Sequence, residues 1–256
     1  MSAFPAVFVS HGAPTLALED GAAHQFLRGF GETLGRPRAI LVASAHWLTP
    51  APSVCAVETP KTIHDFGGFP RALYQLSYPA PGAPELAEQV IELLAAAGIV
   101  AVPDQEWGLD HGAWVPLMLM YPATDIPVLQ IALQPQLGVQ HHFALGRALA
   151  ALREDGVLIL GSGGATHNLR ELGPSALPPA WARDFSDWLN EKIGNGDTDA
   201  LIHYRTLAPQ AARNHPTEEH FLPLLVAAGA ATTGRGRRVH TSTTYGSLMM
   251  DNYVFD

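Results

Sequence analysis

Short apolar runs without regular polar alternation are the feature of this sequence that most restricts its fold. Four of them occupy residues 6–10, 39–45, 128–133 and 157–160. A strand with one face in water alternates apolar and polar residues, so these runs indicate strands that are buried on both faces. A sheet built from such strands needs a layer of helices on each side.

The stretches between the runs have helical periodicity. Residues 84–97 carry an apolar stripe at helical spacing and are followed by Gly98, a frequent helix terminator. Further helices are predicted over residues 138–154, 180–193 and 217–228. The tail, residues 238–255, is richer in Thr, Tyr and Val and is expected to add antiparallel strands. This alternation predicts an α/β fold, a single three-layer domain over residues 1–256 with a central, largely parallel (mixed) sheet and helices on both faces.

Composition excludes several classes of protein. Hydrophobic residues make up 47% of the 256 positions and charged residues 15%, which is typical of a large folded interior. The net charge of −9 disfavours nucleic acid and anionic membranes as partners. A single cysteine, Cys55, excludes an internal disulfide framework, and we assign it to packing. With neither a signal peptide nor a long apolar segment in the sequence, we expect a cytoplasmic protein that does not enter the membrane.

Twelve histidines are the compositional anomaly. His11 and His46 directly follow predicted strands, and His167 follows a third after the turn GSGGAT. The carboxyl ends of parallel strands meet at one edge of a sheet, so these three side chains should converge there. They form either a metal site or a buried polar network. We assign five others to ordinary surface positions: His24, His141, His142, His203 and His240.

The remaining candidates lie in loops and at helix ends. His111 follows Asp110, which either orients it or simply caps a helix. His215 and His220 are five residues apart, so they are not an HExxH-type pair on one helix face. The long loop 59–83 contains His64 and four aromatic residues that could wall a flat substrate or pack as loop residues: Phe66, Phe69, Tyr74 and Tyr78.

Common nucleotide and hydrolase motifs are absent. Ser162 lies in GSGGAT, which is neither the G-x-S-x-G turn of serine hydrolases nor a G-x-G-x-x-G dinucleotide loop. No phosphate loop of the Walker type occurs. Arg170 is a candidate partner for a substrate carboxylate, although an exposed structural arginine is the simpler interpretation.

Seven segments, in order along most of the chain, resemble the class III extradiol ring-cleaving dioxygenases, and best the DOPA-dioxygenase-type branch. They are SHGAP (10–14), SAHW (44–47), TIHDFGGFP (62–70), YPAPG (78–82), GLDHGAW (108–114), GSGGATHNLR (161–170) and PTEEHFLPLL (216–225). The resemblance implies an α/β fold with a non-haem metal at the edge of its sheet. It implies cleavage of a small catechol, DOPA or a similar compound, by O2 next to the two hydroxyls.

The same resemblance implies a role for each histidine. His11, His46 and His220 match metal ligands, and His167 matches an acid/base that also reaches the metal when substrate is absent. His111 matches a residue that contacts substrate or oxygen. Activity would need Fe(II), while so many imidazoles also make Zn(II) a plausible bound metal. A zinc-dependent hydrolase and a non-catalytic zinc-binding protein on the same fold are the alternatives.

Overall fold

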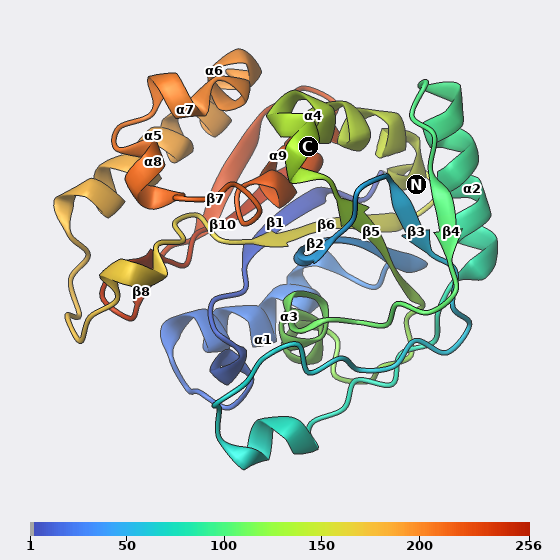
Figure 1. Ribbon diagram of the computed structural model, residues 1–256, viewed down its shortest axis with the longest axis horizontal. Helices are drawn as coiled ribbons and strands as arrows, with labels where there is room; N and C mark the ends of the chain where they lie inside the picture. Colours follow the sequence, from blue (N-terminus) through green and yellow to red (C-terminus); the bar gives the residue numbers. More distant parts are fainter. Residues whose placement is uncertain (1–2) are drawn as a thin grey trace.

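A computed structural model describes residues 3–256, which build an eight-stranded sheet with helices on both faces (Figure 1). The strand order across the sheet is β4-β3-β5-β2-β6-β1-β10-β7. The bounds of these strands are β1 Ala6–Ser10, β2 Ala39–Leu48, β3 Ser53–Cys55, β4 Val102–Asp104, β5 Val128–Leu133, β6 Val157–Gly163, β7 Gly236–His240 and β10 Asn252–Phe255. A separate small hairpin joins β8 Thr243–Thr244 to β9 Leu248–Met249.

The centre of the sheet is parallel, and antiparallel strands complete it at both sides. β2 pairs in parallel with β5 and β6, and β6 pairs in parallel with β1. β10 is antiparallel to β1 and to β7, and β3 is antiparallel to β5. The largely parallel, mixed sheet and the antiparallel tail are therefore confirmed.

Helices form the two outer layers. α1 Ala22–Leu34 and α3 His111–Met120 lie on one side of the sheet, and α4 Gly138–Leu149 and α9 Leu222–Gly229 on the other (Figure 1). Neighbouring strand residues such as Ile40 and Leu41 point to opposite faces and belong to the two separate apolar clusters. The remaining helices are α2 Pro84–Ala96, α5 Ala180–Asn195, α6 Thr198–Ile202, α7 Tyr204–Leu207 and α8 Ala211–Asn214. Short 3-10 turns occupy η1 Pro14–Ala17, η2 Arg71–Gln75, η3 Pro135–Leu137, η4 Ala150–Arg153 and η5 Leu169–Glu171.

Two predicted boundaries near the histidines are wrong. β2 continues to Leu48, which pairs with β5, so His46 lies within the strand and not after it. The helix predicted over residues 217–228 begins only at Leu222, and His220 lies in the preceding turn. Pro223 explains the late start, because proline fits the first turn of a helix but breaks the hydrogen bond of an interior position.

The glycines of β6 let α9 approach the sheet closely. A Cβ at Gly161 would lie 2.1 Å from the backbone oxygen of Pro223, and a Cβ at Gly163 would lie 2.2 Å from that of His220. The side chain of any other residue would overlap these backbone oxygens, so both positions require glycine. The Gly-rich segment therefore serves helix packing beside the site. None of the helices within residues 3–256 combines the length and the apolar character needed to cross a membrane.

Candidate active site

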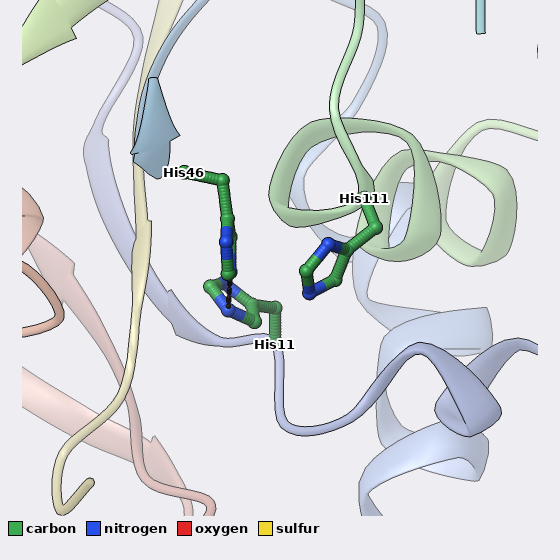
Figure 2. Close-up of side chains that lie close together, drawn as sticks. All are labelled: His11, His46 and His111. Carbon is green, nitrogen blue, oxygen red and sulfur yellow. Dashed lines mark hydrogen bonds between the residues drawn. The ribbon is translucent and has the colours of Figure 1, made fainter. Parts of the chain in front are cut away.

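Five histidines from distant parts of the chain meet at the carboxyl edge of the parallel strands. His11 follows β1, His46 lies near the end of β2, His111 begins α3, His167 follows β6, and His220 precedes α9. The ring centres of His11, His46 and His220 are 4.9 to 5.3 Å apart. Figure 2 shows the rings of His11, His46 and His111 turned toward a common point. The convergence predicted for His11, His46 and His167 is thus present, with His111 and His220 added.

The tautomer of His11 is set by a buried serine. The Ser162 hydroxyl donates to the backbone oxygen of Gly112, so its oxygen accepts from His11 Nδ1 at 3.0 Å. His11 Nε2 then carries a lone pair, and it lies 3.0 Å from Nε2 of His46 (Figure 2). Ser162, whose segment is not a serine-hydrolase motif, therefore holds this ring.

Asp65, from the long loop, contacts two of the rings. Its Oδ1 accepts from the backbone N–H of His111, and its Oδ2 accepts from His111 Nδ1, each at 2.9 Å. Oδ2 also lies 3.5 Å from Nδ1 of His46. These contacts place the Nδ1 protons beside the carboxylate, so the Nε2 lone pairs of His46 and His111 face the centre of the cluster.

His167 and His220 stack on the opposite side. Their ring centres are 3.3 Å apart and their planes differ by 7°. Glu219 Oε1 accepts from Nδ1 of His220 at 3.2 Å and lies 4.0 Å from Nδ1 of His167. Two potential metal-ligand groups result, His11 with His46 and His111, and His167 with Glu219 and His220, each with its donor atoms within 4.8 Å of one another.

The cluster is electrically suited to bind a cation. Burial lowers the pKa of His46 to about 3 and that of His167 to about 4, and it lowers the pKa of His11 and His220 well below the usual value. These rings are therefore neutral near pH 7, which is the form of histidine that binds metals. Two facing lone pairs 3.0 Å apart need a positive group between them, and nitrogens bound at about 2.1 Å from one ion can have this spacing. The residues present thus fit a metal ion.

Asp110 is the N-cap of α3, as one of the two interpretations of its place beside His111 predicted. Its Oδ1 accepts from the backbone N–H of Ala113 at 3.3 Å and from the Ser44 hydroxyl at 2.6 Å. A Cβ at Gly112 would lie 2.4 Å from Ser44 Oγ, so the first turn of α3 needs glycine to pack against β2. Asp110 consequently fixes where α3 begins, and the orientation of the His111 ring comes from Asp65.

A cavity of about 350 Å³ opens over the histidines. Phe66 and Phe69 of the long loop line it, whereas Tyr78 is buried and donates to the backbone oxygen of Tyr121, and Tyr74 packs beside Phe66. Four further lining residues were not predicted from the sequence: Leu169, Leu172, Tyr245 and Leu248. Leu169 lies within the segment GSGGATHNLR, and the other three lie outside the seven segments. A largely apolar cavity with a few converging polar groups is the usual form of a small-molecule site.

The histidines that we assigned to the surface lie outside this site, but two of them are not at the surface. His24 and His142 are buried, with Nδ1 bonded to the backbone oxygens of Leu16 and Gly138. Backbone partners of this kind allow a neutral ring to be buried at little cost. Cys55 is buried against Trp107, which agrees with its assignment to packing, and Arg170 is exposed.

Comparison with known proteins identifies the family. The family described as the catalytic LigB subunit of aromatic ring-opening dioxygenase matches residues 5–256. This chain belongs to that family. The LigB-family chain is 46% identical over 254 residues to a 4,5-DOPA dioxygenase extradiol of Beta vulgaris, covering 97% of this chain and 95% of the relative. It is 44% identical to a protein with the same description from Escherichia coli (strain K12), covering 88% and 84% of the two chains.

A solved structure has the same fold. The crystal structure of an uncharacterised protein from Escherichia coli K12 superposes with a TM-score of 0.83 at 35% identity, covering 99% of this chain and all of that one. Family membership makes this LigB-family protein an extradiol aromatic ring-opening dioxygenase, an oxidoreductase that cleaves a catechol with O2. Enzymes of this family depend on a metal, and the histidine cluster could bind one. The zinc-hydrolase and non-catalytic alternatives are not favoured.

Proposed function

We propose that this protein, acting as one catalytic domain, cleaves the ring of DOPA or a similarly small catechol with Fe(II) held by His11, His46 and His220. The observation that carries the proposal is the pair of facing Nε2 atoms of His11 and His46, 3.0 Å apart beside the cavity that His46 lines. The names of the relatives support DOPA as a substrate. Bound at this point, Fe(II) would supply the redox chemistry that lets O2 react with a catechol.

His220 and His111 compete for the third ligand position. The ring centre of His220 is 5.3 Å from that of His11 and 5.0 Å from that of His46. The ring centre of His111 is 5.5 Å from that of His11 and 3.8 Å from that of His46. We favour His220, since the family resemblance matches it to a ligand and leaves His111 facing substrate or oxygen. Metal analysis of the two alanine variants, each purified as apoprotein and reconstituted with Fe(II), should show which histidine is the third ligand. Loss of metal is expected for His220→Ala, and metal retention for His111→Ala.

His167 is proposed as the acid/base that moves the catechol protons. Its pKa, lowered by burial to about 4, keeps the ring neutral and able to accept a proton near pH 7. Its ring stacks against that of the proposed ligand His220, which supports a role in which His167 also reaches the metal in the absence of substrate. The nearby Glu219 carboxylate would stabilise the imidazolium that forms. His167→Ala should retain metal and lose most ring opening.

His111 is proposed to contact substrate or oxygen through Nε2. Asp65 binds its Nδ1 proton, so Nε2 presents a lone pair to the cavity. Phe66 and Phe69 would hold the flat face of the catechol and exclude water from the reacting atoms.

The all-nitrogen site would also accept Zn(II), which we propose as a competing and inactive occupant. The test is elemental analysis of protein purified without oxygen, followed by oxygen uptake and mass spectrometry of the ring-opened product after addition of Fe(II) or Zn(II). Uptake with DOPA is expected for the Fe(II) protein alone. His203→Ala, which removes an exposed histidine, is the matched control. Equal activity with Zn(II), or none with either metal across a series of catechols, would contradict the proposal.

A further inference from the structure

A second, smaller cavity of about 80 Å³ adjoins the one over the histidines. The two cavities share Gly12, Ala13 and Tyr245 in their walls. The carboxylate of Glu19 lines the smaller cavity only. Tyr245 therefore stands between the histidine cavity and a negative charge.

Hydrogen bonding makes Tyr245 an acceptor toward the main cavity. Its hydroxyl lies 2.9 Å from Glu19 Oε1 and 2.8 Å from Thr15 Oγ1, and the Thr15 hydroxyl itself donates to Glu19 at 2.5 Å. Whichever partner takes it, the single Tyr245 proton is committed within this group. The Tyr245 oxygen can therefore offer a ligand in the cavity only lone pairs, and the negative Glu19 carboxylate lies next to this oxygen.

The position of Tyr245 is fixed by its backbone. Its φ of +48° is in the left-handed region, which a residue other than glycine occupies at a cost. The N–H of Gly173 donates to the Tyr245 backbone oxygen at 2.9 Å. The backbone of Gly173 therefore holds this turn on one side, and the side chain of Glu19 holds it on the other. Both contacts keep the Tyr245 ring at the cavity wall.

The charged side chains in the walls of the two cavities are of one sign, and the proposed metal ion at the histidines is the positive charge nearby. Among residues 3–256, no lysine or arginine lines either of them. Arg170 lies between Leu169 and Leu172, which both line the main cavity, but it is exposed and is not part of the wall. The rings of Phe66 and Phe69 add faces that attract cations and not anions.

We propose that Tyr245 and Glu19 form a subsite for a cationic side chain on the catechol, so that this protein prefers catechols that carry a primary ammonium to those that carry a carboxylate. The inference rests on the proposed function, since it places the catechol ring at the histidines. The ammonium would donate to the Tyr245 oxygen and be attracted by Glu19 behind it. A carboxylate in the same place would face an acceptor and a like charge.

The test is calorimetric binding to the metal-loaded protein without oxygen, using dopamine and hydrocaffeate, with oxygen uptake on neutral ethylcatechol measured separately. Dopamine should bind roughly 10-fold or more tightly than hydrocaffeate, the effect of one hydrogen bond to a charged group. Glu19→Gln and Tyr245→Phe should each remove most of this ratio. Asp20→Asn changes the same unit of charge at the neighbouring exposed residue and should keep it.

Equal or tighter binding of hydrocaffeate to the wild type would overturn the inference. An unchanged ratio in Glu19→Gln would do the same, as would an equal loss of the ratio in Asp20→Asn, because the effect would then come from net charge. Failure of the proposed function is a different result, the absence of oxygen uptake with ethylcatechol, and the binding ratio can be read whether or not the ring is cleaved.

Discussion

Replacing Asp65 by asparagine should weaken catalysis through the ring of His111. The carboxylate accepts both the backbone N–H and the Nδ1–H of His111 at 2.9 Å, whereas an amide can accept only one of them. The backbone N–H cannot change, so the amide oxygen would stay with it and the amide NH₂ would face Nδ1. His111 would then have to give up its Nδ1 proton and carry one on Nε2, turning an acceptor into a donor inside the cavity.

The size of the effect follows from the geometry. The contact is charge-assisted, and the side chains of Asp65 and His111 are only 19% and 8% exposed. Burial raises the pKa of Asp65, but hydrogen bonds and charge interaction with His111 outweigh it and hold the pKa below the usual value. Loss of such a bond costs about 2 kcal/mol, so kcat/KM for a catechol should fall about 30-fold.

Oxygen uptake by the Fe(II) protein measures this loss, and metal analysis accompanies it. Metal content should fall much less than activity, because Asp65 bonds His111 at 2.9 Å but lies 3.5 Å from Nδ1 of the proposed ligand His46. Asp125→Asn, at an exposed carboxylate paired with Arg36, is the control and should keep full activity. The reasoning is refuted if Asp65→Asn retains wild-type kcat/KM, or if it loses its metal in proportion to its activity.

Other predictions concern the metal, the packing of the site and its response to pH. Ser162→Ala removes the acceptor of the Nδ1–H of His11, a proposed metal ligand, and should weaken Fe(II) affinity about 10- to 100-fold in a metal titration, with the fold retained in circular dichroism. Gly163→Ala places a Cβ 2.2 Å from the backbone oxygen of His220, in the turn before α9, and should lower the free energy of unfolding by about 1–3 kcal/mol. The control Gly194→Ala adds a Cβ in open space and should not lower it. Similar denaturant midpoints for the two variants would contradict this prediction. Burial lowers the pKa of His142 to about 4, so its contribution to stability is present above the unfolded pKa of about 6.5 and is lost as the pH falls. Between these two values, unfolding free energy in His142→Gln should fall less steeply with decreasing pH, by about 1.4 kcal/mol per pH unit, and parallel curves would be evidence against the assignment.

Strand ends explain why part of the site could be predicted from the sequence. The apolar runs that form β1, β2 and β6 are recognisable without tertiary information, and the histidines near their carboxyl ends must meet at one edge of the sheet. His46 shows why an error in the boundary of β2 did little harm. β2 extends past the apolar run to pair Leu48 with Leu133, and this lengthening keeps His46 at the same edge. The roles assigned to the individual histidines stay predictions.

Loop residues could not be placed from the sequence, because distant contacts decide their positions. Asp65 lies within a segment that matches the family, but its role depends on a hydrogen bond to the backbone of His111, 46 residues away. Tyr245 belongs to a short hairpin without periodicity, and its partners Thr15 and Glu19 lie near the other end of the chain. His220 was predicted from the family resemblance alone, since the start of α9 depends on packing against β6.

The long loop, residues 59–83, both orients a histidine of the site and forms part of the cavity wall. Asp65 holds the ring of His111, while Phe66 and Phe69, one and four residues further on, form part of the cavity wall. A substitution that reshapes this wall to admit a bulkier compound will also disturb the carboxylate, so new specificity gained there carries a loss of turnover. Leu172 also lines the cavity, and its apolar side chain makes none of the hydrogen bonds that hold the histidine rings. Divergence of substrate range within this scaffold should therefore proceed more easily from the side of the cavity that does not orient a histidine.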